Sequence, residues 1–196
     1  MTERTLIGSV RTRAFRPVWL LEELGLPFTY LPLRPGSPEV LPFNPAGKVP
    51  VLVEGDLTLT DSTAILDHLA LQTDRFTFAA GSAGHARQAS LTYRLLDEFD
   101  AVLWTAARHS FVLPEEHRLP AIKDSLKWEF ARNQARMVTE LIGPFLMGEE
   151  MTVPDIILTH CLGWAEMAQF PALDPVWADY LARMRSRPAY ERTKAR

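Results

Sequence analysis

The spacing of hydrophobic residues changes near residue 75, and this change limits the folds open to the chain. Before that point, short apolar runs alternate with helix-like segments in the order strand, helix, strand, turns, strand, strand, helix. From about residue 83 onward the periodicity is helical and no convincing strand follows. The sequence therefore predicts an α/β domain over residues 1–74, a linker over about 75–82, and an all-α helical bundle over 83–196.

The first domain is predicted to contain four strands and two longer helices. The strands cover residues 4–10, 28–33, 49–53 and 57–60, the helices cover 14–25 and 62–72, and turns with a short helical piece fill 34–47. Gly25 ends the first helix, as a glycine after the last helical residue usually does. A helix between the first two strands makes them parallel, with a right-handed crossover. The hairpin signal at 54–56 makes the last two antiparallel, so the sheet is mixed.

The second domain is predicted to be a bundle of four or five helices. Its clearest helical segments are 85–110, 119–143, 155–168 and 176–187. The first has an apolar stripe at Leu95, Phe99, Val102, Leu103 and Ala106, and a polar and aromatic side at Tyr93, Asp97, Asp100, Trp104 and Arg108. Thr152 and Asp155 are spaced as the N-cap and third residue of a capping box, with Pro154 in the first turn.

Composition excludes several classes of function. A net charge of −3 and a pI near 6.0 give no electrostatic basis for binding nucleic acid or an anionic membrane. No apolar run approaches the roughly 20 residues of a membrane span. The single cysteine, Cys161, cannot form an intramolecular disulfide and is expected to be a packing residue, which suits a reducing cytoplasm. The histidines show no close pairing, so no metal site is expected.

One segment, GKVPVLVEGDLTLTDSTAIL at residues 47–66, combines three features in a fixed order. Pro50 stands at the start of an apolar strand, where it cannot donate to a sheet ladder. A hairpin follows, and Asp61 and Ser62 then precede a helix. An acid followed by a hydroxyl is a good helix cap, and the free amides beside it also suit a bound carboxylate. Each feature alone is structural, but their order suggests a binding site.

Four segments together resemble the cytosolic glutathione S-transferase family, in its bacterial type with a serine- or threonine-like active site. They are NPAGKVPVL with LTLTDSTAIL (44–52 and 57–66), WLLEELGLPF (19–28), FLMGEEMTVPDI (145–156) and MRSRPAY (184–190). The resemblance covers the whole chain and is weakest between about 73 and 143. It implies a thioredoxin-like N-terminal domain followed by the helical bundle, with glutathione as a co-substrate and no tightly bound cofactor.

The resemblance also implies how glutathione would be held. A cis peptide bond before Pro50 would present the Val49 amide and carbonyl to the tripeptide as to an added strand. Asp61 would pair with the ammonium group and Ser62 with the γ-glutamyl carboxylate. Lys48, and less directly Arg34, would serve the glycyl carboxylate, and Arg11 would lie near the thiol. The alternatives are a trans proline that starts an edge strand, a plain helix cap at Asp61 and Ser62, and a solvated lysine.

In the family a hydroxyl or thiol after the first strand stabilises the glutathione thiolate. Aligned backward from the Glu-Glu-Leu-Gly run at 22–25, Thr12 takes the usual serine position, and Ser9 is the fallback. Threonine departs from the pattern because its methyl group restricts χ1, and Thr12 could instead cap the first helix. Pro17 is a second departure, since proline is tolerated only in the opening turn. Arg11, Arg13 and Arg16 would add positive charge nearby.

The predicted function is a transferase in which the glutathione thiolate attacks a small hydrophobic electrophile, as in detoxification. The co-substrate pocket would use Val10 and the face formed by Tyr93, Asp97, Trp104 and Arg108. The resemblance implies a homodimer, and the composition adds the expectation of a cytoplasmic protein with no nucleic-acid or membrane partner. The alternative is a non-catalytic relative that keeps the scaffold as a binding or interaction protein, and the unusual Thr12 favours it.

Overall fold

The computed structural model describes residues 3–196, which form two compact units. The first contains the residues up to Ala80 together with Met184–Arg196, and the second contains Gly81–Arg183. Among the described residues, no helix combines the length and apolar character needed to cross a membrane. The α/β segment followed by a helical segment agrees with the predicted fold class.

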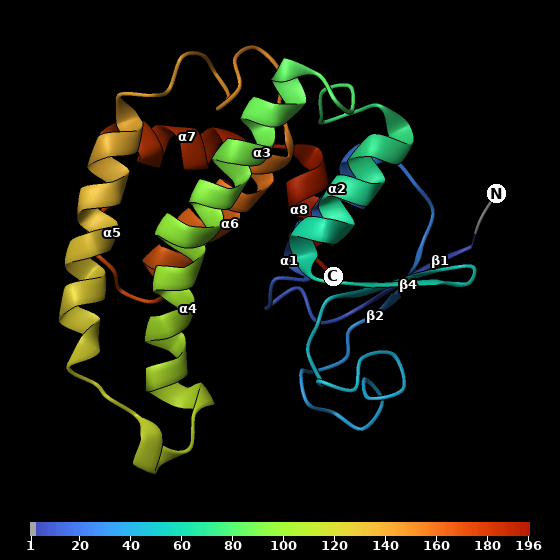
Figure 1. Ribbon diagram of the computed structural model, residues 1–196, viewed down its shortest axis with the longest axis horizontal. Helices are drawn as coiled ribbons and strands as arrows, with labels where there is room; N and C mark the ends of the chain where they lie inside the picture. The colour runs from blue at the N-terminus through green and yellow to red at the C-terminus, as the bar shows by residue number, and fades with distance from the viewer. Residues whose placement is uncertain (1–2) are drawn as a thin grey trace. The chain divides into compact units, whose positions relative to one another are not determined.

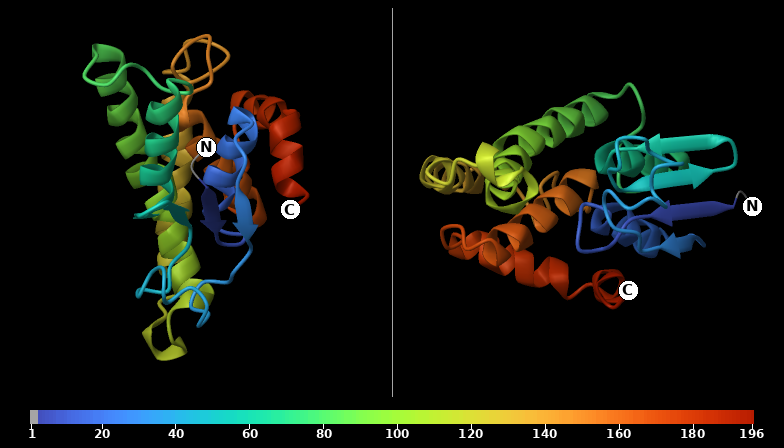
Figure 2. Two further views of the ribbon diagram at one scale, coloured as in Figure 1. Left: turned by 90° about the vertical axis from the view of Figure 1, so that its right-hand side faces the viewer. Right: turned by 90° about the horizontal axis from the view of Figure 1, so that it is seen from below.

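A four-stranded mixed sheet forms the centre of the first unit. Its strands are β1 (Arg4–Ile7), β2 (Thr29–Leu31), β3 (Val51–Glu54) and β4 (Leu57–Thr60), in the order β2-β1-β3-β4 (Figure 2). β1 runs parallel to β2 and antiparallel to β3, and β3 pairs with β4 through the predicted hairpin. β1 is shorter than the predicted strand 4–10, because Gly8 turns the chain with a φ of 131°.

Two helices of the first unit supply most of its apolar core. In α1 (Phe15–Leu24) seven consecutive residues, Phe15 to Leu21, are buried, and Gly25 ends the helix in the left-handed conformation with a φ of 67°. In α2 (Ser62–Thr73), which covers the predicted helix 62–72, Ile65, Leu66 and Leu69 are fully buried on one side. The segment 34–47 forms turns without the predicted short helix.

A buried carboxylate links two strands of the sheet to α2. Glu54 at the end of β3 is 7% exposed and contacts Arg4 Nη2 and His68 Nε2, each at 2.7 Å. Gln72 Nε2 lies 3.4 Å from the same carboxylate. Burial opposes ionisation of Glu54, but these partners together hold its pKa below the ordinary value. We call Arg4, Glu54, His68 and Gln72 the Glu54 cluster.

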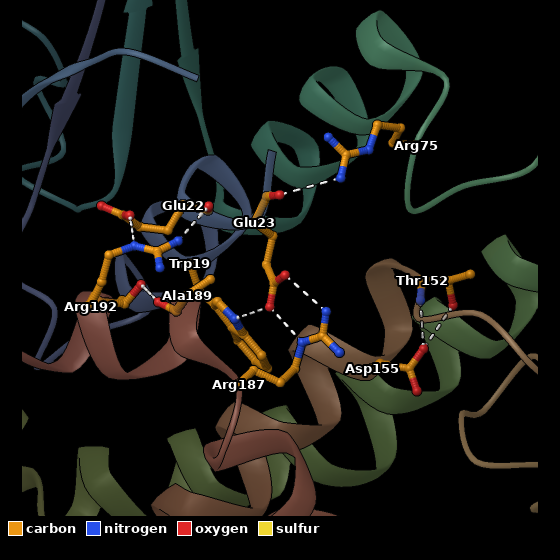
Figure 3. Close-up of polar contacts among 10 residues, drawn as sticks. Trp19, Glu22, Glu23, Arg75, Thr152, Asp155, Arg187, Ala189 and Arg192 are labelled. Carbon is orange, nitrogen blue, oxygen red and sulfur yellow. Dashed lines mark hydrogen bonds and ion pairs between the residues drawn. The ribbon is translucent and has the colours of Figure 1, made fainter. Parts of the chain in front are cut away.

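The segment 184–196 packs on α1, although the sequence placed it with the second domain. α8 (Pro188–Lys194) lies against α1, where Tyr190 meets the rings of Phe15 and Trp19 edge to face. Arg187 forms a bidentate pair with Glu23, with N–O distances of 2.6 and 2.9 Å, and Glu23 also accepts from Trp19 Nε1 at 2.9 Å (Figure 3). These contacts assign residues 184–196 to the first unit.

The second unit consists of helices. Its elements are α3 (Ala83–Leu95), the π-helix η1 (Leu96–Ala101), α4 (Val102–Ala107), the π-helix η2 (Arg108–Val112), the 3₁₀-helix η3 (Glu115–His117), α5 (Ile122–Val138), α6 (Val153–Met167) and α7 (Pro175–Arg185). The predicted helix 85–110 is therefore one long helix that a π-helical segment, η1, interrupts and a second, η2, ends, with α5 beside it (Figure 1). All five residues of its predicted apolar stripe are buried, but Asp100 on the predicted polar side is buried as well.

A capping box begins α6, as predicted. Asp155 is fully buried and its carboxylate accepts the Thr152 amide at 2.8 Å and the Thr152 hydroxyl at 3.0 Å (Figure 3). It also accepts the Leu146 amide and the Tyr180 hydroxyl, at 2.9 and 2.7 Å. Cys161 is fully buried on the same helix, as expected of a packing residue. α5 ends at Val138, five residues before the predicted end at Gly143.

Candidate functional site

The loop between β1 and α1 is held by hydrogen bonds from five consecutive amides. The amides of Gly8 and Ser9 donate to the carbonyls of Leu31 and Leu33, at 2.8 and 3.0 Å. The Val10 amide donates to the Tyr30 hydroxyl at 3.0 Å. The Arg11 amide donates to Ser9 Oγ at 3.3 Å, and the Thr12 amide to the Ser9 carbonyl at 3.0 Å. Each amide from residue 8 to 12 thus already has an acceptor within the protein.

The two candidate hydroxyls of this loop, those of Thr12 and Ser9, differ in whether the proton is already donated to an acceptor in the protein. Thr12 Oγ1 donates to the Ser9 carbonyl at 2.7 Å and accepts the Ala14 amide at 3.1 Å, so its single proton is engaged in the turn that leads into α1. Ser9 Oγ accepts the Arg11 amide, and no acceptor for its proton lies among the described residues. Ser9 is therefore the hydroxyl in this loop that is ready to donate to a ligand.

The segment before β3 lies against this loop. The Val49–Pro50 peptide bond is cis, and Pro50 is buried. Neither the amide nor the carbonyl of Val49 takes part in a hydrogen bond with the described part of the chain. A Cβ built on Gly8 would lie 2.8 Å from Val49 Cβ and 2.9 Å from Ala14 Cβ, so only glycine allows this close approach. The first unit thus brings the Ser9 loop and the free Val49 backbone together.

At the start of α2, the predicted ligand groups also serve the protein itself. Asp61 has a φ of 73°, which is uncommon for an aspartate, and its carboxylate caps α2 by accepting the amides of Thr63 and Ala64 at 2.7 and 3.2 Å. Asp61 remains exposed. Ser62 is only 2% exposed, and Arg16 Nη1 lies 3.3 Å from its Oγ. Both the cap and the buried hydroxyl match the structural alternative considered for this pair.

The three predicted cations of the site are solvent-facing. Arg11, Arg34 and Lys48 are exposed, and none forms an ion pair within residues 3–196. The Lys48 carbonyl accepts from Asn44 Nδ2 at 2.9 Å, which anchors the turn that carries its side chain. Their charge is thus available to an anionic ligand rather than engaged in a structural ion pair.

The residues predicted for a co-substrate pocket fall in both units. Val10 is half-buried in the first unit. In the second unit, Tyr93 lies on α3, Asp97 on η1, Trp104 on α4 and Arg108 on η2. Tyr93 is 68% exposed, Asp97 and Arg108 are exposed, and Trp104 is half-buried. Among the described residues no group of three or more His, Cys, Asp or Glu is placed to hold a metal ion.

The sequence did not reveal the positions of two residues near this loop, Arg16 and Tyr30. Arg16 was taken for a cation beside the thiol, yet it is fully buried and reaches Ser62. The signal for its burial was its place among the apolar residues at the start of α1, between Phe15 and Pro17. Tyr30 received no role, and its bond to Val10 connects positions 20 residues apart. No local pattern reveals a contact of that kind.

Comparison with known proteins finds one protein family that matches the sequence of the first unit. Residues 12–72 match the model of the glutathione S-transferase N-terminal domain. Over 79 residues the chain is 38% identical to the glutathione S-transferase-like protein gedE of Aspergillus terreus, a match that covers 35% of each chain, so the aligned part spans about a third of that relative.

Solved structures extend the likeness to the whole fold. A glutathione transferase from Methylococcus capsulatus is 25% identical and superimposes with a TM-score of 0.80, covering 97% of this chain and 96% of that one. The transferase URE2P8 from Phanerochaete chrysosporium, solved with oxidized glutathione, has a TM-score of 0.83 at 20% identity, covering 100% of this chain and 95% of that one. Residues 12–72 therefore match a glutathione S-transferase N-terminal domain, and the whole chain has the fold of the solved glutathione transferases.

Proposed function

We propose that this protein is a glutathione transferase in which Ser9, rather than Thr12, donates a hydrogen bond to the glutathione thiolate. The observation that supports this assignment is the hydrogen bond that the Thr12 hydroxyl donates to the Ser9 carbonyl, with an O–O distance of 2.7 Å, so its proton is not free for a ligand. With the five loop amides also engaged, Ser9 carries the hydroxyl of the β1–α1 loop whose proton has no acceptor among the described residues. The solved relative URE2P8, which was crystallised with oxidized glutathione, supports the choice of ligand.

In this proposal the remaining site residues orient the tripeptide. The unpaired Val49 backbone pairs with the cysteinyl main chain as an added strand would. Asp61 faces the γ-glutamyl ammonium group, with Ser62 beside it at the start of α2, where the helix dipole favours a carboxylate. Lys48, helped by Arg34, serves the glycyl carboxylate. Arg11, two residues after Ser9 in sequence, adds positive charge that favours the thiolate.

The reaction follows from the activated sulfur. A free thiol is only a few per cent ionised at neutral pH, and a hydrogen bond to the anion lowers its pKa. The proton leaves to solvent, the thiolate attacks the electrophilic carbon, a carbon–sulfur bond forms and the leaving group departs with its electron pair. The electrophile is a small apolar compound, for which we propose Val10, Tyr93, Asp97, Trp104 and Arg108 as contacts. We also propose that the protein works as a cytoplasmic homodimer.

A comparison of two hydroxyl deletions tests the assignment. A hydrogen bond to a charged acceptor contributes about 1.5 to 3 kcal/mol, so Ser9→Ala should raise the pKa of bound glutathione by about 1 to 2 units. Thr12→Val should change that pKa by at most about half a unit, since it removes only a bond to the Ser9 carbonyl, and should lower thermal stability. The pKa is read from the ultraviolet absorbance of the thiolate, and activity from conjugation of chlorodinitrobenzene.

The non-catalytic alternative draws support from two observations, the burial of Ser62 and the capping role of Asp61. It expects wild-type protein that is folded yet conjugates no electrophile. Failure of the wild type both to bind immobilised glutathione and to conjugate chlorodinitrobenzene would refute the transferase proposal. An unchanged thiol pKa in Ser9→Ala, with turnover intact, would refute the role of Ser9 alone.

A further inference from the structure

Tyr30 stands where β2 meets the loop that carries Ser9. It is the middle residue of β2 and pairs with Leu6 of β1 in the parallel ladder. Its side chain extends past the end of β1, and its hydroxyl accepts the Val10 amide at 3.0 Å. Val10 follows Ser9 directly, so this bond restrains the peptide unit that joins the two residues.

The bond from Tyr30 is one of three that tie the loop to the same short segment. The other two run from the Gly8 and Ser9 amides to the carbonyls of Leu31 and Leu33. Those two are bonds between backbone atoms, which a side-chain substitution leaves in place. The bond to Tyr30 can be removed by deleting one atom, the hydroxyl oxygen. A restraint on the peptide unit after Ser9 limits the ψ angle of Ser9 and thereby the direction of its side chain.

The Tyr30 ring also contacts a cation, Arg196. The guanidinium of Arg196 lies 5.7 Å from the centre of the Tyr30 ring and 4.8 Å from that of Phe28. Arg196 Nε also binds Glu22 Oε1 at 2.9 Å, so α1, β2 and Arg196 are joined through these contacts. Burial raises the pKa of Tyr30, against the opposing influence of Val10 and Arg196, and the phenol therefore stays neutral.

We propose that Tyr30 is a positioning residue for Ser9: by holding the Val10 amide it aims the Ser9 hydroxyl at the glutathione sulfur. This inference rests on the proposed function, since it assigns Tyr30 a part in the ionisation of the bound thiol. Tyr30 touches no reacting atom. Its effect is transmitted through one peptide unit, so its loss should disturb ionisation more than glutathione binding.

Tyr30→Phe tests the inference, because it removes the hydroxyl and keeps the ring under Arg196. We expect the pKa of bound glutathione to rise by about half a unit, which lowers kcat/KM about threefold at pH values below that pKa and leaves alkaline turnover unchanged. The dissociation constant of glutathione should change less than about twofold. Tyr190→Phe is the matched control, since its hydroxyl makes no hydrogen bond within residues 3–196 and its ring also lies on α1.

The outcomes separate this inference from the proposed function. If wild-type protein conjugates chlorodinitrobenzene but Tyr30→Phe matches Tyr190→Phe in the thiol pKa, Tyr30 has no positioning role. A parallel loss of thermal stability and glutathione affinity at constant thiol pKa also overturns the inference, because it indicates a purely structural bond. If the wild type neither binds nor conjugates, the proposed function fails first, and the inference fails with it.

Discussion

Replacing Asp155 with asparagine should destabilise the second unit by a predictable amount. The carboxylate accepts four hydrogen bonds in a fully buried site: Oδ1 from the Leu146 amide and the Tyr180 hydroxyl, and Oδ2 from the Thr152 amide and hydroxyl. Asparagine has the same shape but only one acceptor oxygen. With that oxygen in the place of Oδ1, its NH2 group faces the Thr152 amide, and two donors then oppose each other.

The magnitude follows from counting donors. The Thr152 hydroxyl can turn and accept from the new NH2 group, so one buried amide loses its acceptor, at a cost of about 1 to 3 kcal/mol, and charge-assisted bonds become neutral. An opposing gain arises because burial disfavours the ionised carboxylate and raises its pKa, a penalty that asparagine does not carry. We expect a net loss of about 2 to 3 kcal/mol in unfolding free energy. For a chain of this size that corresponds to a fall in Tm of about 4 to 12 °C.

Urea unfolding followed by far-ultraviolet circular dichroism measures this difference. Asp179→Asn is the matched control, because Asp179 is exposed on α7 and makes no hydrogen bond with the described residues. Tyr180→Phe should cost about 1 kcal/mol, since it removes one of the four donors. If Asp155→Asn unfolds at the same urea concentration as Asp179→Asn, the reasoning about opposed donors is wrong.

Two further predictions concern the first unit. The pKa of Glu54 lies below its ordinary value of 4.5, so the stability that the ionised carboxylate contributes is complete above pH 4.5 and is lost as the pH falls through the folded-state pKa. Glu54→Gln should therefore flatten the acid side of the profile of unfolding free energy against pH, measured by urea unfolding. An unchanged acid slope would contradict this. Gly8→Ala should raise the dissociation constant of glutathione about tenfold or more in calorimetry, because the added Cβ would lie 2.8 Å from Val49 Cβ. Gly25→Ala is the control, because Gly25 has a positive φ but no atom within 4 Å of an added Cβ; it should lose only about 1 to 2 kcal/mol of stability and keep its affinity for glutathione. Equal affinities in the two variants would argue against the close approach of Gly8 to Val49.

Features encoded by neighbouring residues were predictable from the sequence. The capping box needs only Thr152 and Asp155 at a spacing of three, and the end of α1 needs only Gly25. The strands of the β3–β4 hairpin and the buried stripe of α2 follow from periods of two and 3.6 residues. These signals are local, so no tertiary contact is needed to interpret them.

Features set by distant contacts were missed. Residues 184–196 read as the end of a helical bundle, yet Arg187 bonds to Glu23, 164 positions away. The engaged proton of Thr12 depends on the path of the turn after Ser9, which periodicity does not describe. The π-helical segments change the register within a helix whose sequence pattern remains helical, so the predicted rod was right in extent and wrong in its regularity. The roles of the site residues remain predictions until the variants above are measured.

The return of residues 184–196 to α1 has a consequence during synthesis of the protein. The intervening unit, Gly81–Arg183, occupies the ribosome for about 5 to 20 s at ordinary elongation rates. Throughout that interval Trp19 lacks its edge-to-face partner Tyr190, and Glu23 lacks Arg187. The α/β unit therefore leaves the ribosome before the residues that cover the aromatic side chains of α1 have been made, and its packing is completed only by the last residues of the chain.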